Sequence, residues 1–382
     1  MLHFWNHRSL DRRELLRAGG IAVGGLSLSG LISRQAGAAT GSRSFGKARN
    51  CILLYLSGGP AQLDTFDPKP DAPDDIRGEF STIPTSLPGV RFSELLPNAS
   101  KWMHKSALVR TMCHDHNDHG RGSYWMFTGY QYPGSVPDVE KMSRSDMPHM
   151  GSCVAKLAPG AGPLPPFALV PHRMDVSSGR RAGQFAGALG PRFDPLLTGG
   201  NPNSDDFKLD HIPLIANQPA DVVRRRLSLV DQLNLQTDSL NDLAMSRTIR
   251  EGQAKAVSVI SSEAVRKAID LSSVPKDDRE RYGRNLFGQS VLLGRRMLDA
   301  GVRLVQCNWQ RRQGKNGFAW DTHWNNFSAH KEDLVPPFDQ AFHALMTDLE
   351  RTGKLEETLV VVAAEFGRSE EHTSELQSRF GI

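Results

Sequence analysis

Acidic and histidine side chains gather in three short segments of the sequence. Asp64 lies in the first, Asp321 and His323 lie in the third, and the second, residues 114–119, holds three histidines and two aspartates. Carboxylates and imidazoles without cysteine are the ligands of a hydrolytic Zn, Mn, Mg or Ca site rather than of a structural zinc finger. These residue types predict a divalent-metal or active site, with a solvated polar turn as the alternative for the second segment.

Each segment comes after a run of residues that has the pattern of a β-strand. The longer runs are continuously apolar, as in strands of a parallel sheet that helices cover on both faces. Because the carboxyl ends of parallel strands meet at one edge of the sheet, a metal there can collect ligands from several loops. The predicted strands are residues 51–57, 107–111, 302–307 and 359–364, with a short further strand at 168–170, and Glu365 closes the last long one.

Helix-like segments alternate with these strands. We expect helices near residues 93–105, 121–127 and 334–351, and an almost wholly helical block over residues 217–300 with a break near residues 273–275. The alternation predicts an α/β fold with a mostly parallel central sheet, and the helical block is expected to be an insertion or cap.

Gly58 and Gly59 follow the first predicted strand. They lack the spacing of a dinucleotide fingerprint and the lysine of a phosphate loop, so nucleotide binding is not indicated. Two glycines at a strand end favour a tight turn that brings Asp64 and Thr65 back over the sheet edge. Thr65 is a candidate nucleophile if a metal activates its hydroxyl. The alternative is that this hydroxyl bonds the backbone of its own loop.

The composition excludes several classes of protein. The chain has 382 residues, a net charge of +4, 39% hydrophobic residues and 23% charged residues. These values are typical of a soluble globular protein, and the charge is too small to indicate a nucleic-acid partner. No apolar run approaches the roughly 20 residues that cross a bilayer, so we expect no transmembrane segment in the mature chain.

Residues 1–38 have the pattern of a twin-arginine export signal. Arg12 and Arg13 precede a short uncharged stretch, and Ala36 and Ala38 form a small-residue cleavage site. The alternative is an ordinary amphipathic helix, which the five glycines between positions 19 and 30 would weaken. The pattern predicts cleavage after Ala38, the twin-arginine export machinery as a partner, and a location in the periplasm or cell envelope.

Residues 369–382 differ in character from the sequence before them. Together with Arg368, most of this segment resembles the conceptual translation of a sequencing-library adapter. We therefore expect residues 369–382 to be non-native and the C-terminal part of the domain to be missing. A genuine polar tail is the alternative.

Five ordered motifs carry a resemblance to a known family. They are residues 51–70, 76–80, 116–120, 320–323 and 365–368. Over residues 50–368 the chain resembles domain-of-unknown-function family 1501, an exported bacterial family often described as sulfatase-like and grouped with the alkaline phosphatase and sulfatase superfamily.

The resemblance implies an alkaline-phosphatase-like α/β sandwich over residues 39–368, with a metal site at the carboxyl edge of the sheet. Superfamily enzymes hydrolyse phosphate or sulfate esters through a metal-activated Ser, Thr or formylglycine nucleophile. The implied catalytic residue is Thr65. By position, the implied metal-site residues are Asp64, His116, His119, Asp321, His323 and Glu365.

The sequence departs from the superfamily pattern in three ways. No cysteine has the Pro and Arg context of formylglycine enzymes, so a formylglycine mechanism is disfavoured. The family's Thr-Pro continuation and Gly-Arg-Asp-His-Trp motif after Arg368 are absent, and Gly58 stands where many superfamily enzymes keep a metal-binding Asp. The expected function is therefore an exported metal-dependent hydrolase acting on a small-molecule or glycan ester of phosphate or sulfate. The alternative is a non-enzymatic cell-envelope binding or assembly protein on a degenerate scaffold.

Overall fold

The computed structural model describes residues 46–135, 141–160, 162, 164–176, 179–207, 262–310, 320–322 and 325–367. The predictions for the export signal, for residues 217–261 of the helical block, for His323 and for residues 369–382 lie outside the described residues. The elements below belong to one compact unit, Arg49–Ile382.

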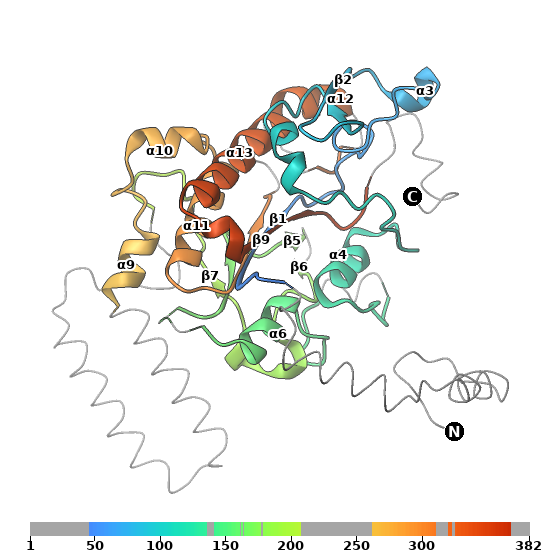
Figure 1. Cartoon of the computed structure of the whole chain (residues 1–382). Coiled ribbons are helices and arrows are strands. Elements are labelled where there is room, and N and C mark those ends of the chain that lie inside the picture. The colour runs from blue at the N-terminus through green and yellow to red at the C-terminus, as the bar shows by residue number, and fades with distance from the viewer. Residues whose placement is uncertain are drawn as a thin grey trace, which may run out of the picture. The chain divides into compact units, whose positions relative to one another are not determined.

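A five-stranded parallel sheet forms the centre of this unit (Figure 1). Its order is β7-β4-β8-β1-β9, and all its strand pairs are parallel. The strands are β1 (Asn50–Tyr55), β4 (Phe167–Val170), β7 (Leu196–Leu197), β8 (Leu304–Asn308) and β9 (Thr358–Ala363). The sheet confirms the predicted α/β class and four of the five predicted strands, with ends shifted by one or two residues.

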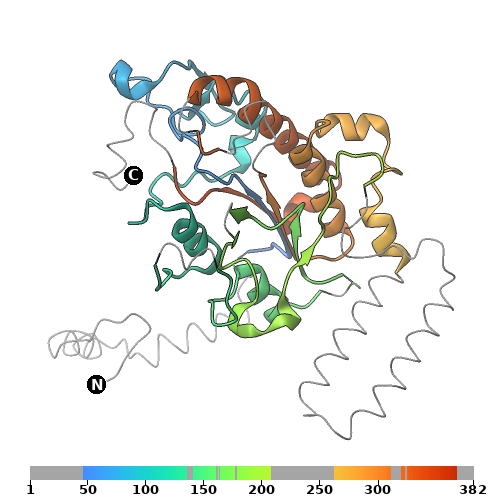
Figure 2. The same cartoon turned by 180° about the vertical axis from the view of Figure 1, so that it is seen from behind.

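Helices cover both faces of the sheet (Figures 1 and 2). Ile52 and Leu54 of β1 face the core cluster of α11 and α13, whereas Leu53 and Tyr55 pack with Phe127 of α4 on the other face. This arrangement explains why the strand is apolar without alternation. The helices are α3 (Asp74–Arg77), α4 (His119–Thr128), α6 (Met150–Leu157), α9 (Glu263–Ile269), α10 (Lys276–Arg281), α11 (Leu286–Asp299), α12 (Asn326–Ala329) and α13 (Val335–Arg351).

Smaller elements complete the described part of the unit. The two antiparallel hairpins are β2 (Thr82–Pro84) with β3 (Arg91–Ser93), and β5 (Asp175–Val176) with β6 (Gly179–Arg180). Residues 99–105 and 187–193 contain 3-10 turns, and residues 330–334 form a π-helical turn before α13. The predicted break near residues 273–275 is confirmed as the gap between α9 and α10.

The predicted strand at residues 107–111 is wrong. Residues 106–114 form neither helix nor strand, and the Val109 side chain is 63% exposed. Arg110 lies at the surface, where its Nε is 3.0 Å from Asp67 Oδ1. Three apolar residues precede Arg110, but Val109 faces solvent, so the run does not form a strand that is buried on both faces.

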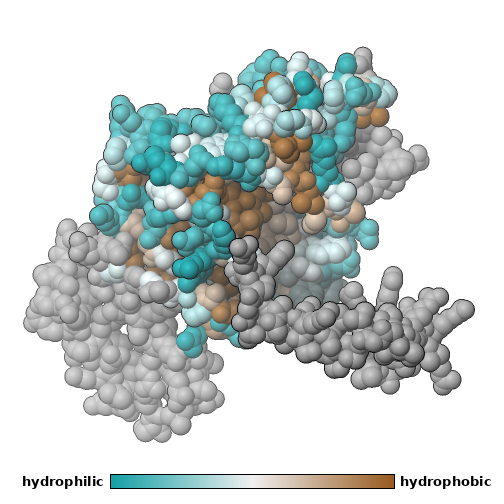
Figure 3. Space-filling model, viewed as in Figure 1, coloured by the Kyte–Doolittle hydropathy of each residue, from teal (hydrophilic) through white to brown (hydrophobic). Residues whose placement is uncertain are grey.

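β9 is the last strand at one side of the described sheet. The Leu359 side chain is 52% exposed, and the following residues of β9 are half-buried. On the face seen in Figure 3, apolar side chains gather in the middle, where Figure 1 shows β1 and β9. Within the described residues, no strand lies beside the outer edge of β9.

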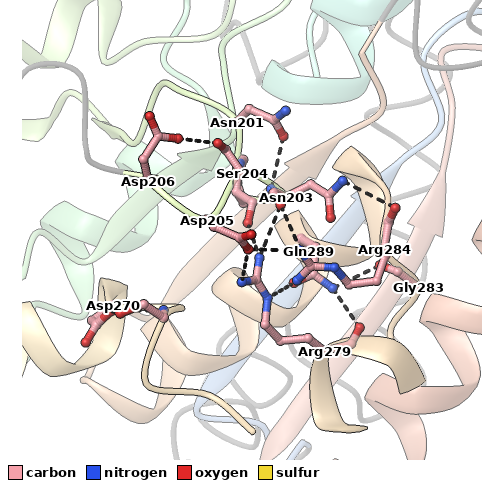
Figure 4. A network of polar contacts seen from close by, with 12 residues as sticks. Asn201, Asn203, Ser204, Asp205, Asp206, Asp270, Arg279, Gly283, Arg284 and Gln289 are labelled. Atoms are coloured by element: carbon pink, nitrogen blue, oxygen red, sulfur yellow. Dashed lines mark hydrogen bonds and ion pairs between the residues drawn. The ribbon is translucent and has the colours of Figure 1, made fainter. Parts of the chain in front are cut away.

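A buried cation ties the loop after β7 to α10 and α11 (Figure 4). Arg279 is 5% exposed, and its Nε donates to Gln289 Oε1 at 2.7 Å. Its Nη2 donates to Pro202 O at 3.0 Å, and its Nη1 lies 3.3 Å from Asp205 Oδ1. The positive charge of the Arg279 guanidinium therefore faces hydrogen-bond acceptors on the loop after β7. A buried guanidinium needs such acceptors in place of water.

Within the described ranges, none of the helices combines the length and the apolarity needed to span a membrane.

A buried neutral histidine joins α6 to the sheet. His149 Nδ1 accepts from Gly151 N at 2.9 Å and so caps α6, while Nε2 lies 2.9 Å from Gln306 Oε1. Because Nδ1 accepts, Nε2 carries the hydrogen and donates it. The ring stacks on Phe167 with centroids 4.5 Å apart. Burial lowers the pKa of His149 to about 3, although the bond to Gln306 opposes this shift.

We predict that His149 makes the protein less stable in acid. Its folded-state pKa of about 3 lies below the ordinary value of 6.5. The unfolded chain therefore binds more protons between these values, and stability falls as the pH drops through this window. Within this window, the loss in the free energy of unfolding that is due to His149 approaches about 1.4 kcal/mol for each pH unit.

Urea unfolding at several pH values between about 7 and 4.5 checks this prediction. His149→Asn keeps an acceptor for the α6 cap but cannot be protonated, so its stability should depend less steeply on pH. Equal slopes for the two proteins would contradict the prediction.

Candidate functional site

Three of the predicted site residues meet at the carboxyl edge of the sheet. Glu365 lies two residues after β9, and His119 begins α4. Asp321 follows Trp320, whose backbone N–H donates to Ser57 O at 3.0 Å, just beyond β1. The parallel strands bring these loops together, as the sequence predicted.

His119 lies between two carboxylates. Its Nδ1 donates to Glu365 Oε1 at 2.7 Å, and its Nε2 is 3.3 Å from Asp321 Oδ1. The His119 side chain is 25% exposed and that of Asp321 is 15% exposed, whereas the side chain of Glu365 is fully buried. The Nδ1 side of the imidazole is thus bonded to the buried Glu365, and the Nε2 side faces the more exposed Asp321.

The carboxylates change the proton affinity of this histidine. Burial by itself lowers the pKa of His119, but the hydrogen bonds and charges of Asp321 and Glu365 outweigh it and raise the pKa to about 9. Burial by itself raises the pKa of Glu365, but the hydrogen bond and charge of His119, with the charge of Arg181, hold it below its usual value. The structure therefore contains a charged imidazolium–carboxylate pair at neutral pH.

Three donors fix the Glu365 carboxylate. Besides His119, the backbone N–H of Gly58 donates to Oε1 at 2.9 Å, and the Tyr55 hydroxyl donates to Oε2 at 2.8 Å. These donors come from β1, the turn after it and the start of α4. A buried carboxylate needs such a set of donors to stay ionised.

Two glycines permit these close approaches. Gly58 has a φ of +119°, and a Cβ there would lie 2.7 Å from the Trp320 carbonyl carbon and still closer to Asp321 N. A Cβ on Gly122 would lie 3.2 Å from Glu365 Cβ. The chain therefore has room for no side chain at position 58, directly after the first strand.

The start of α4 holds His119 in place. Asp118 caps the helix, since its Oδ1 accepts from Arg121 N at 2.9 Å. The Arg181 Nη1 donates to His119 O at 3.3 Å and to Ser123 Oγ at 3.1 Å. Ser123, one turn into α4, lies 3.0 Å from the Tyr55 hydroxyl.

Asp64 joins this region through a hydrogen-bonded chain. Its Oδ2 accepts from Asn326 Nδ2 at 2.7 Å, and Asn326 Oδ1 accepts from the hydroxyl of Thr322, the neighbour of Asp321, at 2.6 Å. Asp64 is fully buried, and its Oδ1 has no hydrogen-bond partner among the described residues. Burial raises the pKa of Asp64 to about 6, against the opposing bond from Asn326.

Thr65 lies beside Asp64 but uses its hydroxyl locally. The side chain is 2% exposed, and Oγ1 donates to Ala61 O at 2.8 Å. This bond corresponds to the alternative that the sequence left open. The nucleophilic role of Thr65 stays a prediction.

His116 lies apart from the His119 contacts. It packs against Trp125 with ring centroids 5.5 Å apart, and within the part of the chain that the structure describes its buried Nε2 has no hydrogen-bond partner. Burial, with the nearby positive charge of Arg121, lowers the pKa of His116. The neighbouring His114 instead contacts the site, because its Nε2 donates to Glu365 O at 2.6 Å.

The sequence did not single out four residues that complete the site. His114 belonged to the predicted histidine cluster, so its type and position were a usable signal. Tyr55 ends an apolar strand, and Ser123 and Arg181 stand alone in the sequence, so no local pattern marks them. They are identified only by contacts across long sequence separations.

The donor types at this edge suit a divalent cation. Carboxylate oxygens and an imidazole are ligands of Zn, Mn and related ions, and the buried Asp64 Oδ1 is a free acceptor. In the part of the chain that the structure describes, however, no three His, Cys, Asp or Glu side chains form a metal-binding group. The residue types fit a metal, and the carboxylates of Glu365 and Asp321 instead contact His119, whose pKa they raise to about 9.

We predict that Glu365→Gln lowers the proton affinity of His119. The amide removes the negative charge that favours the imidazolium, so the pKa of His119 should fall from about 9 by at least about one unit. Titration of the imidazole resonances by NMR measures this value. Glu357→Gln, at an exposed ion pair with Arg49, is the matched control. An unchanged His119 pKa in the Glu365 variant would contradict the assignment.

We also predict that Gly58→Ala destabilises the protein more than Gly89→Ala. Both glycines have positive φ values, +119° and +83°, so both substitutions carry backbone strain of about 1–3 kcal/mol. Only the first also meets other atoms, because nothing lies within 4 Å of a Cβ on Gly89. We expect Gly58→Ala to cost about 2 kcal/mol more in urea unfolding. Equal losses would show that the turn can move aside.

Comparison with known proteins agrees with the family motifs. No curated protein and no solved structure matches this chain. A family model described as "Protein of unknown function (DUF1501)" matches residues 48–377, which is most of the sequence. The chain therefore belongs to the DUF1501 family of proteins of unknown function.

Proposed function

We propose that this chain is an exported metal-dependent hydrolase of phosphate or sulfate esters, built on an alkaline-phosphatase-like version of the α/β fold. The observation that best supports the proposal is the position of His119 between the buried Glu365 and the more exposed Asp321. This arrangement places carboxylate and imidazole ligands at one edge of the sheet. The imidazole of His119 is oriented by Glu365, and its side toward Asp321 is partly exposed.

Glu365 acts in this proposal as the residue that orients His119. Metal-binding histidines commonly donate their second ring N–H to a carboxylate, which fixes the ring and its tautomer. Glu365 accepts from Nδ1, so a neutral His119 presents the lone pair of Nε2 on the side of Asp321. We assign His119 and Asp321 as ligands. Asp64 stays a predicted ligand on the strength of its buried Oδ1, although the described structure does not bring these three side chains into one metal-binding group.

A divalent cation at these residues would polarise an ester oxygen and lower the pKa of a water molecule. Arg181 stands beside Glu365, and its Nη1 bonds an uncharged hydroxyl and a carbonyl, so its positive charge favours an anionic substrate. The buried Thr65 hydroxyl is bonded to Ala61 O. Water is therefore the nucleophile we favour over Thr65.

The location is part of the same proposal. Arg12 and Arg13 and the small-residue site at Ala36 and Ala38 support export by the twin-arginine route to the cell envelope. That route carries folded proteins, which suits a protein that takes up its metal before export.

The test is metal binding and ester cleavage by the whole chain. Purified protein is assayed with Zn²⁺, Mn²⁺, Mg²⁺ and Ca²⁺, using p-nitrophenyl phosphate and p-nitrophenyl sulfate. We expect metal-dependent cleavage that falls at least about 100-fold in His119→Ala and in Asp321→Asn, because each variant removes a ligand. Metal content is measured on the same samples.

His104→Ala is the control, since His104 is an exposed histidine that bonds Ser86 away from the site. It should keep full metal content and activity. Protein that binds none of the four metals and cleaves neither ester would overturn the proposal. That outcome would favour a non-enzymatic envelope protein, which a stable partner recovered from the envelope would support.

A further inference from the structure

Tyr55 is a buried polar residue that the proposed function does not use. It ends β1, it is 0% exposed, and its ring packs against Phe127 with centroids 4.7 Å apart. Its hydroxyl donates to Glu365 Oε2 at 2.8 Å.

The hydroxyl belongs to a hydrogen-bonded chain whose direction is fixed. Arg181 can only donate, and its Nη1 lies 3.1 Å from Ser123 Oγ. Ser123 lies 3.0 Å from the Tyr55 oxygen, and since the single Tyr55 hydrogen goes to Glu365, Ser123 donates to Tyr55. The chain therefore runs from Arg181 through Ser123 and Tyr55 to the carboxylate.

The other end of the same carboxylate orients His119. Glu365 Oε1 accepts from His119 Nδ1 at 2.7 Å and from Gly58 N at 2.9 Å. Rotation of the carboxylate would move both oxygens together, so a donor fixed on Oε2 also fixes the position of Oε1. Arg181 further donates to His119 O, which ties the backbone of that histidine to the same chain.

We propose that Tyr55 is a positioning residue of this site, which holds Glu365 in the orientation that fixes the His119 imidazole. Ser123 and Arg181 hold the Tyr55 hydroxyl in turn. Tyr55 touches neither a ligand position nor the exposed face of His119, so it acts only through Glu365. The relevance of Tyr55 to catalysis rests on the proposed function, whereas its effect on the position of Glu365 and His119 can be measured without metal.

Tyr55→Phe removes the hydroxyl and leaves the ring. In metal-free protein, the hydrogen-bonded Nδ1 proton of His119 should give a far-downfield ¹H NMR resonance, assigned by its loss in His119→Asn. We expect this resonance to broaden or disappear in Tyr55→Phe, because the acceptor is no longer held. The affinity for Zn²⁺, measured by equilibrium dialysis, should fall at least about tenfold.

Tyr282→Phe is the matched control. Tyr282 is also 0% exposed, and its hydroxyl donates to a buried carboxylate, Asp348 Oδ2, at 3.0 Å, between α10 and α13. It should lose stability without changing the His119 resonance or the zinc affinity. An unchanged resonance in Tyr55→Phe, or the same change in Tyr282→Phe, would overturn the proposal.

Two further measurements keep the test decisive. If Tyr55→Phe does not fold, Ser123→Ala removes the donor behind Tyr55, and a shifted His119 resonance supports the chain whereas an unchanged one overturns it. If the wild-type chain binds none of the four metals and cleaves neither ester, the proposed function fails, while the metal-free NMR comparison still decides the role of Tyr55.

Discussion

The carboxylate of Glu365 is the interaction on which the site depends. Its side chain is fully buried, yet its pKa lies below the usual value, so it carries a charge without contact with water. Removing a carboxylate from water costs several kcal/mol unless donors replace the solvent. The donors here are His119, Gly58 N and Tyr55, which come from separate parts of the chain. The charge therefore fixes the end of β9 against β1 and α4.

Close backbone approach is the second constraint, and it follows from the first. Gly58 can donate to Glu365 only because the backbone of Trp320 and Asp321 lies where its side chain would stand. An Asp at position 58 would displace that backbone. The acidic side chain at this point of the sheet edge is Asp321, which the segment after β8 supplies.

The sequence predicted the sheet better than the site around it. Continuous apolar runs marked β1 and β8 because both faces of these strands are buried, and another run marked β9 although that strand is only half-buried. The same reasoning failed for residues 107–111, where Val109 faces solvent and Arg110 pairs with Asp67.

The convergence of His119, Asp321 and Glu365 was predictable, since parallel strands end at one edge. The role of Tyr55 was not, because a tyrosine that ends an apolar strand has the same local pattern whether its hydroxyl bonds a carboxylate or not. The contribution of Ser123 was hidden in the same way by its place inside a helix.

A proton and a divalent cation would compete for the same place in this site. With His119 protonated, the charges of Glu365 and Asp321 are matched by those of His119 and Arg181. A metal must displace the His119 proton, so its binding releases protons and strengthens as the pH rises toward the histidine pKa of about 9. Among these four side chains, replacing a single positive charge by a double one leaves an excess of positive charge. That excess is what an anionic phosphate or sulfate ester would neutralise, and the charge balance of the metal-free site thus agrees with the class of substrate proposed for the loaded one.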